Sequence, residues 1–470
     1  MKLRKSEILA IPHRESIGFE GLKDFTITGV SIDSRGVAKG DLFIALRGER
    51  FDGHNFISKA VEAGAACILV EQRWSEANAP MMVSIHIPRI VVDNTIESLG
   101  HLAAAYRKKF NIPFVAVAGS NGKTTTKEMI KSVLGTRYRV LSTEGNLNNH
   151  IGLPQMLLQL EHKHEVAVLE IGTNHPGEIA YLCSILRPTH GLITNIGREH
   201  LEFFESLEGV AKAEGELFEW LAGHQGVAFI NCDDQRIQRL KKRVKKKVLF
   251  GFGSGRSLVK GTVVSTDSHG QSLLRVKPVR KKAFEVALGV PGKHNARNAL
   301  AAATVGLELK VRPSDIQKAL AEFHPAKNRT QIQHVAGITI VNDTYNANPD
   351  STLAALDTLK RIESHGKKIA VLADMLELGT HSADLHKHIG KAIADHGIEI
   401  VLTFGELAKS INDAALVDTK AHFDDKNALI EYLFRSVAEG DIVLIKGSRG
   451  MKMEEVVSAL SERLVQISKD

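Results

Sequence analysis

"VAVAGSNGKTTTKEM", residues 115–129, holds the local pattern that decides the fold of this chain. Apolar residues typical of a buried strand lead into "GSNGK", and a helical pattern follows in "TTTKEMIKSVLG". The apolar side of that helix consists of Met129, Ile130, Val133 and Leu134, and Gly135 is its expected end. This order predicts a phosphate-binding loop, because backbone N–H groups at a helix N-terminus attract anions.

Two side chains of the loop support nucleotide binding. Lys123 can reach the terminal phosphates, and the Thr124 hydroxyl can bind Mg²⁺. The usual pattern has four residues between its first glycine and the Gly-Lys pair, whereas only two residues separate Gly119 from Gly122. A short glycine turn without a nucleotide is the alternative. The strand, the Lys-Thr pair and the helix together favour a nucleotide site with a shortened loop.

Short apolar runs alternate with helix-length segments over most of the chain. They include "VAVLEIG", "GLITNIG" and "GVAFIN", and later "ITIVND", "KIAVLAD", "EIVLTFG" and "DIVLIKG". Such alternation is typical of βαβ units with mostly parallel strands. The predicted fold is α/β in three domains: a small mixed α/β domain (1–107), a central P-loop mononucleotide-binding domain (108–325) and a C-terminal Rossmann-like domain (326–470).

The composition agrees with several soluble domains. A chain of 470 residues exceeds one ordinary core, and 43% hydrophobic with 24% charged residues is usual for a globular protein. The apolar runs are too short to cross a bilayer, and the first residues lack the pattern of a signal peptide. The three cysteines show no disulfide or zinc spacing. We expect a cytoplasmic protein without stable membrane insertion.

The net charge of +7 suggests anionic partners without choosing among them. The most basic run is "KKRVKKKV", residues 241–248. No aromatic residues interleave with it to stack on bases, so we interpret it as a solvated helix end and expect no nucleic-acid partner.

Two polar side chains follow strands of the central domain. In an open parallel sheet, ligands bind at the carboxyl ends of the strands. Glu170 ends "VAVLE" and His200 follows "GLITNIG", so both are expected near Thr124, where Mg²⁺ needs further ligands. A surface carboxylate is disfavoured directly after an apolar strand. For His200, one of 21 histidines, an ordinary loop histidine is an equal alternative on these grounds.

Eight motifs through most of the chain carry a family resemblance. The shortened loop "GSNGKT" resembles the variant found in Mur ligases and the related folylpolyglutamate synthetases. The Mur ligase family is also resembled by "EGNLNNHIGLP", "LEIGTNHPGEI", "NIGREHLE", "PGKHNARNALAA", "NDTYNANPDSTLAAL", "LADMLELG" and "KGSRGMKME". The last three, with "DSRGVAKGDLFIALRGERFDGHNF", are similar to the branch that joins D-alanyl-D-alanine to UDP-N-acetylmuramoyl-tripeptide.

The resemblance implies an ATP-dependent amide ligase of peptidoglycan precursor synthesis that forms ADP and phosphate. Its first domain holds the UDP end of the substrate, the second holds ATP, and the third closes over both. Phosphorylation of the tripeptide carboxylate gives an acyl phosphate, which the dipeptide amine attacks. Because two anions meet in the first step, cations must offset their repulsion, and Lys123 and two Mg²⁺ ions supply them.

The resemblance also assigns residues. Thr124 and Glu170 hold one metal, and Glu170 and His200 hold the second. The implied catalytic residues are Lys123, Glu170, His200 and Arg329. The implied nucleotide contacts are Gly119, Ser120, Asn121, Gly122, Lys123, Thr124, Thr125, Asn295, Asn298, Arg329, Asp343 and Tyr345.

Several of these assignments have a plainer alternative. Asn295 and Asn298 are expected on the adenine side, the alternative being helix capping and packing. Arg329 and Asp343 are expected to reach the γ-phosphate and the ribose once the third domain closes. Tyr345 is expected to pack near the nucleotide, the alternative being a buried strand-end tyrosine.

The substrate residues come from two motifs. Asn148 and Asn149 of "GNLNNHIG" are expected to face the sugar or the peptide of the substrate. Asp33, Ser34 and Arg35 match the uridine-pocket segment, and a simple turn is their alternative. The sequence leaves open whether the third residue of the peptide is meso-diaminopimelate or L-lysine.

Two departures from the family pattern stand out. Arg198 and Glu199 are bulky where the family usually has small residues before the histidine. Glu214 stands four residues before Phe218, where many Mur ligases carry a lysine that CO₂ carbamylates. We expect Glu214 to supply this negative charge at the metals unmodified, through a bridging water; a surface helix glutamate is the alternative. Lys212 should face elsewhere, because positions two apart point about 200° away from each other.

Three other classes of protein fit the sequence less well. Folylpolyglutamate synthetases usually carry a "DGAHNP"-like segment where this chain has "NDTYNANP". P-loop motors and nucleic-acid NTPases usually have an aspartate ending the second-metal strand and motor motifs that this sequence lacks. A regulatory nucleotide-binding module does not explain Glu170, His200 and Arg329 together. A monomer is expected.

Overall fold

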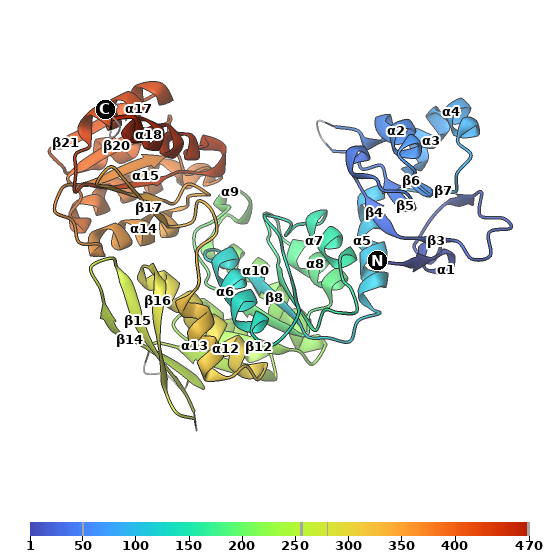
Figure 1. The fold of residues 1–470 in the computed structure, drawn as a ribbon, viewed down its shortest axis with the longest axis horizontal. Coiled ribbons are helices and arrows are strands. Elements are labelled where there is room, and N and C mark those ends of the chain that lie inside the picture. The colour runs from blue at the N-terminus through green and yellow to red at the C-terminus, as the bar shows by residue number, and fades with distance from the viewer. Residues whose placement is uncertain (49–50, 254–256, 280, 468–470) are drawn as a thin grey trace. The chain divides into compact units, whose positions relative to one another are not determined.

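The computed structural model describes residues 1–48, 51–253, 257–279 and 281–467. The chain divides into two compact units. Unit 1 contains residues 1–116, 139–172 and 178–189, and unit 2 contains residues 117–138, 173–177 and the described residues from 190 onward. Figure 1 labels the elements of both.

The N-terminal part of unit 1 is built on a five-stranded sheet in the order β2-β7-β6-β5-β4. Neighbours from β4 to β7 are parallel, and β2 is antiparallel at one edge. The strands are β2 (Glu15–Ile17), β4 (Gly29–Ser31), β5 (Asp41–Ile44), β6 (Cys67–Glu71) and β7 (Arg89–Val92). A separate antiparallel pair joins β1 (Leu3–Arg4) to β3 (Thr26–Ile27).

Short helices accompany the strands of this region, α2 to α4 beside the sheet and α1 beside β3, and a longer helix follows them (Figure 1). The short elements are α1 (Lys5–Ile8), η1 (Ser34–Gly36), η2 (Gly53–Phe56), α2 (Ile57–Glu62), α3 (Gln72–Ala77) and α4 (Ala79–Ser84). Helix α5 (Thr95–Arg107) begins after Asn94, whose side chain accepts from the N–H groups of Ile96 and Glu97.

The rest of unit 1 is a parallel pair with two helices. β9 (Val140–Ser142) pairs with β10 (Val166–Glu170), and the helices are α7 (Gly152–Leu158) and α8 (Glu178–Leu186). All five residues of β10 are buried, which is why the strand reads as a continuous apolar run.

Strand β8 (Phe114–Ala118) contributes residues to both units and leads into α6 (Lys123–Gly135). Met129, Ile130, Val133 and Leu134 of α6 are fully buried. The predicted strand and helix on either side of the glycine loop are therefore confirmed.

In unit 2 the sheet runs in the order β16-β15-β14-β13-β12-β11-β8. The parallel strands are β11 (His190–Ile193), β12 (Val227–Asn231) and β13 (Lys246–Gly251), and β13 also pairs parallel with β14 (Val259–Thr266). The associated helices are α9 (Leu201–Phe204), α10 (Leu207–Gly223), α11 (Gln235–Leu240), η3 (Lys241–Arg243), α12 (Lys293–Glu308) and α13 (Pro313–Ala321).

The sheet ends in a meander that alternating βα units do not predict. β14, β15 (Gln271–Pro278) and β16 (Phe284–Pro291) are antiparallel to one another, with no helix between them. β15 alternates buried and exposed side chains, as a strand with one solvated face does. A short turn joins β14 to β15. The Asp267 carboxylate stabilises it by accepting from the N–H groups of His269 and Gln271.

The C-terminal part of unit 2 is a six-stranded sheet in the order β17-β18-β22-β19-β20-β21, parallel except for the β17–β18 edge. The strands are β17 (Gln331–Val335), β18 (Ile338–Asn342), β19 (Lys368–Ala373), β20 (Ile400–Phe404), β21 (Thr419–Phe423) and β22 (Ile442–Lys446). The helices are α14 (Pro349–Arg361), η4 (Gly379–His381), α15 (Ser382–Ile393), η5 (Ala394–His396), α16 (Lys409–Ala414), α17 (Lys426–Ser436), η6 (Arg449–Met451) and α18 (Glu454–Ile467).

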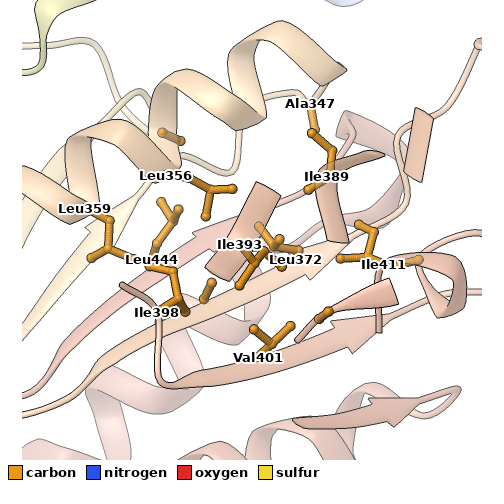
Figure 2. Packing of buried hydrophobic residues seen from close by; sticks show 14 of the residues in the cluster. Ala347, Leu356, Leu359, Leu372, Ile389, Ile393, Ile398, Val401, Ile411 and Leu444 are labelled. Carbon is orange, nitrogen blue, oxygen red and sulfur yellow. The ribbon is translucent and has the colours of Figure 1, made fainter. Parts of the chain in front are cut away.

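Each face of this sheet carries its own core. Figure 2 shows one of them: Leu356 and Leu359 of α14 and Ile389 and Ile393 of α15 lie over Leu372 of β19. The opposite core joins the strands to α17 and α18. Both faces are therefore covered by helices, as in a Rossmann-like domain.

Helix α14 is hydrogen-bonded to the middle of the chain at both of its ends. Before its first residue, Asn348 Nδ2 donates to Asn121 Oδ1 at 2.8 Å. After its last residue, Glu363 N donates to Ser268 O at 2.8 Å, in the turn from β14 to β15.

Candidate active site

The loop between β8 and α6 requires glycine at two positions. Gly119 and Gly122 have φ angles of 112° and 79°, in the left-handed region. A Cβ on Gly119 would lie 2.4 Å from Thr194 Oγ1, and a Cβ on Gly122 would lie 2.9 Å from Asn298 Oδ1. Helix α6 begins at Lys123, so its N-terminus lies at the loop, as phosphate binding requires.

The segment after β11 holds the loop in place. Thr194 Oγ1 donates to Asn121 O at 2.7 Å, and Asn195 Oδ1 accepts from Asn121 N at 3.1 Å. Ser120 Oγ accepts from Gly197 N at 2.8 Å. Two of the predicted nucleotide contacts, Ser120 and Asn121, are thus fixed by the protein itself.

Lys123 folds back on its own loop. Its Nζ donates to the carbonyl oxygens of Gly119 and Ser120 and lies 3.4 Å from Glu199 Oε2. The lysine that is predicted to act on phosphates is therefore already in an electrostatic cluster with a carboxylate. Thr124 and Thr125, which follow it on α6, are both buried.

Glu214 of α10 is a buried carboxylate in contact with the loop. Its side chain is fully buried, and its Oε2 accepts from Gly119 N at 2.7 Å. Among the described residues, the buried Oε1 atoms of Glu214 and Glu199 have no hydrogen-bond partner. Burial raises the pKa of Glu214 to about 8; Lys123 lowers it and Glu199 raises it further. Lys123, Glu199 and Glu214 are called the loop cluster below.

The two candidates for the acidic position on α10 differ in burial. Lys212 is exposed, whereas Glu214 is buried. The prediction that Lys212 faces away is confirmed, and the alternative of Glu214 as a surface helix glutamate is wrong.

The segment around His200 contacts the C-terminal part of unit 2. His200 has a φ of 48°, its Nδ1 lies 2.5 Å from Glu377 Oε2, and its Nε2 lies 4.0 Å from Glu199 Oε2. Arg198 N donates to Asp350 Oδ2 at 2.6 Å, and its guanidinium lies 3.5 Å from Oδ1. The bulky residues before the histidine therefore have their own partners.

Asn295 and Asn298 are buried on α12. Asn295 Nδ2 donates to Pro291 O at 2.7 Å, and Asn298 Nδ2 donates to Asn295 Oδ1 at 3.3 Å. These contacts agree with the alternative in which both asparagines serve helix capping and packing. Because the Asn298 amide also lies against Gly122, the helix is placed beside the phosphate loop.

Asp343 follows β18 and forms a largely buried ion pair with Lys446, the last residue of β22. Lys446 Nζ donates to Asp343 Oδ2 at 2.6 Å and to Asn346 O at 2.8 Å, while Asp343 Oδ1 accepts from Thr330 N at 2.9 Å. Burial acts to raise the pKa of Asp343, but Lys446 keeps that pKa below its ordinary value.

Arg329 and Tyr345 lie together in the same part of the molecule. The Arg329 guanidinium is 3.7 Å from the centre of the Tyr345 ring, a close cation–π contact. The guanidinium of Arg449 lies 5.8 Å from the same ring. Tyr345 is only partly buried, so its alternative as a buried strand-end tyrosine is not what the structure has.

In unit 1, Glu170 is 3% exposed at the end of β10. Its Oε1 accepts from Asn148 Nδ2 at 2.8 Å, and its N–H donates to Thr143 Oγ1 at 2.9 Å. Asn149 Oδ1 instead accepts from Gly152 N at 2.9 Å, at the start of α7. Of the two predicted substrate asparagines, Asn148 is thus joined to a predicted metal ligand, and Asn149 supports a helix.

Asp33, Ser34 and Arg35 form a capped turn at η1. The Asp33 carboxylate accepts from Arg35 N at 3.0 Å and pairs with the Arg35 guanidinium at 2.6 Å. The arginine lowers the pKa of Asp33 to about 2. The three residues therefore form the simple turn that was the alternative to a uridine pocket, and their role in binding uridine stays a prediction.

The structure adds three residues that the sequence analysis missed: Glu377, Asp350 and Lys446. Lys446 carried a signal, because a lysine ending the apolar run "DIVLIK" is unusual for a buried strand. Glu377 and Asp350 lie inside quoted motifs, but nothing local marks their partners.

Across the described ranges, no group of three or more His, Cys, Asp or Glu side chains is arranged to hold a metal ion. The metal set of Thr124, Glu170, His200 and Glu214 stays a prediction. None of the helices in the described chain combines the length and hydropathy that crossing a membrane requires.

Fold and loop define the class of this molecule as a three-domain α/β protein with a P-loop. Models of the Mur ligase family match three stretches: its catalytic domain at residues 26–107, its middle domain at 117–306 and its glutamate ligase domain at 328–449. The chain belongs to the Mur ligase family and is a ligase.

Curated relatives resemble the chain over its length. The UDP-N-acetylmuramoyl-tripeptide–D-alanyl-D-alanine ligase of Bacillus subtilis (strain 168) is 38% identical over 441 residues, 93% of each chain. The ligase of the same name from Escherichia coli (strain K12) is 37% identical, covering 93% of this chain and 95% of its own. A crystal structure of MurF from Acinetobacter baumannii has a TM-score of 0.89 at 31% identity, covering 98% and 99% of the two chains.

A MurF ligase from Thermotoga maritima, solved in complex with ADP, is also similar. Its TM-score is 0.81 at 29% identity, and the match covers 93% of this chain and 98% of that one.

Proposed function

We propose that the chain uses ATP to join D-alanyl-D-alanine to UDP-N-acetylmuramoyl-tripeptide in peptidoglycan precursor synthesis, releasing ADP and phosphate. The similarity over at least 93% of the chain to two ligases named for this reaction carries the proposal. The shortened loop with Lys123 at the start of α6 supports the use of ATP.

The chemistry explains why the loop cluster is charged. A carboxylate is a poor acyl donor because its leaving group would be oxide. Transfer of the γ-phosphoryl group gives an acyl phosphate, and attack by the dipeptide amine releases phosphate. Lys123 brings positive charge to the step in which two anions meet. Its Nζ donates to two carbonyl oxygens of the loop. Bound phosphate oxygens would replace these neutral acceptors and form stronger, charge-assisted hydrogen bonds.

The loop cluster also suits Mg²⁺. The buried Oε1 atoms of Glu199 and Glu214, which have no partner in the described chain, are oxygen donors of the kind Mg²⁺ prefers. Thr124, Glu170, His200 and Glu214 would hold the metal ions. Bound Mg²⁺ supplies positive charge that offsets the repulsion between phosphate and carboxylate.

Nucleotide recognition in this proposal draws on two regions. Asn295 and Asn298 face the adenine side from α12. Arg329 lies over the Tyr345 ring and reaches the γ-phosphate. A guanidinium that is already stacked on an aromatic face loses little conformational freedom when it binds a phosphate. Asp343 reaches the ribose with the lone pairs that Lys446 and Thr330 leave free.

The substrate sites belong to unit 1. Asp33, Ser34 and Arg35 form part of the uridine pocket, and Asn148 and Asn149 face the sugar or peptide. Asn148 donates to Glu170, so its position is tied to that of a proposed metal ligand. The protein acts as a cytoplasmic monomer in this proposal.

A phosphate-release assay tests the function. Turnover of ATP that requires both the UDP-tripeptide and D-alanyl-D-alanine is expected. Turnover stimulated by folate with glutamate, or by nucleic acid, would overturn the proposal. Running the assay with tripeptides that end in meso-diaminopimelate and in L-lysine identifies the preferred third residue.

The proposal for Glu214 is that it acts as an unmodified anion. We expect activity that is insensitive to removal of bicarbonate, and a raised Mg²⁺ requirement with lower turnover in Glu214→Ala. Lys212→Ala is the matched control on the same helix and should leave both unchanged. Bicarbonate-dependent activity that is lost in Lys212→Ala but kept in Glu214→Ala would reverse the assignment.

A further inference from the structure

Glu377 reaches His200 from a different part of the fold. It follows β19 in a segment that is fixed by two backbone hydrogen bonds: Leu376 N donates to Ser448 Oγ at 2.8 Å, and Met375 N donates to His386 Nε2 at 3.0 Å. The residue itself has a φ of 62°, so its backbone is held in the left-handed region. A segment constrained in this way presents its side chain in a defined direction.

The same segment lies directly against the short helix that follows His200. Glu202 N donates to Glu377 O at 3.2 Å. A Cβ on Gly379 would lie 3.1 Å from the Cα of Glu202, so the two backbones leave little space between them. The approach of Glu377 to His200 therefore rests on contacts between the two backbones as well as on the side chains.

The two ring nitrogens of His200 face different groups. Nδ1 lies 2.5 Å from Glu377 Oε2 in an ion-pair contact and, within the described chain, has no hydrogen bond of regular geometry. Nε2 lies 4.0 Å from Glu199 Oε2, which is itself 3.4 Å from Lys123 Nζ. With Nδ1 held by the carboxylate, Nε2 is the nitrogen on the side of the loop cluster.

We propose that Glu377 is a positioning residue that fixes the imidazole of His200 so that Nε2 is available on the side of the phosphate loop. The inference rests on the proposed function, which makes His200 a metal ligand. A histidine that binds a metal through one nitrogen usually gives the other N–H to a carboxylate or carbonyl, which fixes the tautomer and the ring orientation. Here that carboxylate comes from the C-terminal part of the chain, so the orientation of the His200 ring depends on contact with this part.

The competing interpretation is a partly exposed ion pair without function. The Glu377 side chain is 47% exposed, and exposed pairs contribute little to stability. The two interpretations differ in what Glu377→Gln does. The glutamine oxygen can still accept from Nδ1–H but carries no charge, so it preserves ring orientation and removes the ion pair.

Mn²⁺ binding in the presence of a non-hydrolysable ATP analogue, followed by electron paramagnetic resonance, tests the proposal without turnover. Glu377→Ala is expected to weaken Mn²⁺ binding on the order of 10-fold or more. Glu377→Gln should recover most of that loss. His200→Ala sets the full effect of removing the ligand.

Asp350→Ala is the matched control, because Asp350 also connects this part of the chain to the segment before His200, but through Arg198. It should leave Mn²⁺ affinity unchanged. Equal losses in Asp350→Ala and Glu377→Ala would overturn the proposal, since docking alone would then explain the effect. A loss in His200→Ala but none in Glu377→Ala would overturn it while leaving the metal role of His200 intact. No loss in His200→Ala would overturn both.

A second measurement needs neither metal nor substrate. Nitrogen-15 spectra of the ligand-free protein, with the His200 signals assigned by their loss in His200→Gln, report which ring nitrogen carries the proton. The Nδ1–H tautomer is expected in wild type and in Glu377→Gln, and a mixture in Glu377→Ala. The same tautomer in all three proteins would contradict the positioning role.

Discussion

The loop cluster and the Asp343–Lys446 pair are both buried arrangements of opposite charges, but they differ in how far the protein satisfies them. Asp343 and Lys446 bond to each other, and each has a further backbone partner. In the loop cluster two carboxylates share one lysine, and the Oε1 atoms of Glu199 and Glu214 have no partner in the described chain. The pKa values follow this difference, lowered for Asp343 and raised for Glu214.

This difference separates a charge pair whose members satisfy each other from a cluster whose carboxylates are only partly satisfied by the protein. A buried carboxylate with a close cation is stable as an anion, whereas one without sufficient partners is costly until a ligand arrives. The same substitution, carboxylate to amide, should therefore have opposite effects in the two regions.

The largest expected effect is on catalysis in the loop cluster. Lys123→Ala should lower turnover on the order of 10³-fold, because charge stabilisation at the transferred phosphoryl group is lost. Binding of the UDP-tripeptide should be unchanged in calorimetry, since its proposed contacts lie elsewhere. Lys131→Ala, at a half-exposed position on the same helix, is the control. A matched loss of UDP-tripeptide affinity would argue against this separation of roles.

The next effect is on stability at the satisfied pair. Asp343→Asn leaves Lys446 buried without its counter-charge and should lower the free energy of unfolding by about 3 kcal/mol in urea titrations. Because the pKa of folded Asp343 is depressed, this stabilisation is present above the unfolded pKa and is lost as pH falls through the folded one. Asp357→Asn, which breaks the i,i+4 pair with Arg361, should cost less than about 1 kcal/mol.

The same kind of substitution in the loop cluster should act in the opposite direction. Folded Glu214 keeps its proton to about pH 8 and the unfolded carboxyl loses it near 4.5, so wild-type stability falls as pH rises between these values. Glu214→Gln removes this dependence. Without ligands, the free energy of unfolding of Glu214→Gln should rise relative to that of wild type by roughly 2 to 3 kcal/mol as the pH increases from 5.5 to 8. Glu208→Gln, at an exposed position of α10, is the control, and destabilisation by Glu214→Gln at pH 8 would break the comparison.

The smallest expected effect concerns the cation–π contact between the Arg329 guanidinium and the Tyr345 ring in the C-terminal region. Arg329 over Tyr345 is held by a cation–π contact, so a double-mutant cycle of Arg329→Ala and Tyr345→Leu should give a coupling of about 1 kcal/mol in the free energy of unfolding. The longer contact of Lys426 with Phe404, 5.6 Å from the ring centre, should couple less strongly. Equal couplings would show that proximity to the ring does not hold Arg329.

Local pattern was sufficient to predict the glycine loop and the strand and helix on either side of it. The glycine loop, α6 and the place of Glu170 at the end of a buried strand follow from short-range rules of strand, turn and helix, whereas Asp343 was assigned only through the family resemblance. Glu214 was also placed correctly relative to Lys212, because helical periodicity separates positions two apart.

Partners distant in sequence were not predictable. Asp343 and Lys446 are 103 residues apart, and only the pairing of β18 with β22 brings them together. Glu377 meets His200 through the contact of two loops with left-handed residues, which no periodicity reports. The meander β14–β16 was missed because the alternation of apolar runs with helix-length segments does not predict successive strands with no helix between them.

Helix α14 is held by a hydrogen bond at each of its two ends. Its 13 residues span about 20 Å. One support is Asn121 of the phosphate loop, and the other is the turn at Ser268. A tilt of about 10° around the turn would move the end at Asn121 by roughly 3 Å over that length, the size of one hydrogen bond. A rotation of that size at the Ser268 turn would therefore be enough to break the contact between Asn348 and Asn121.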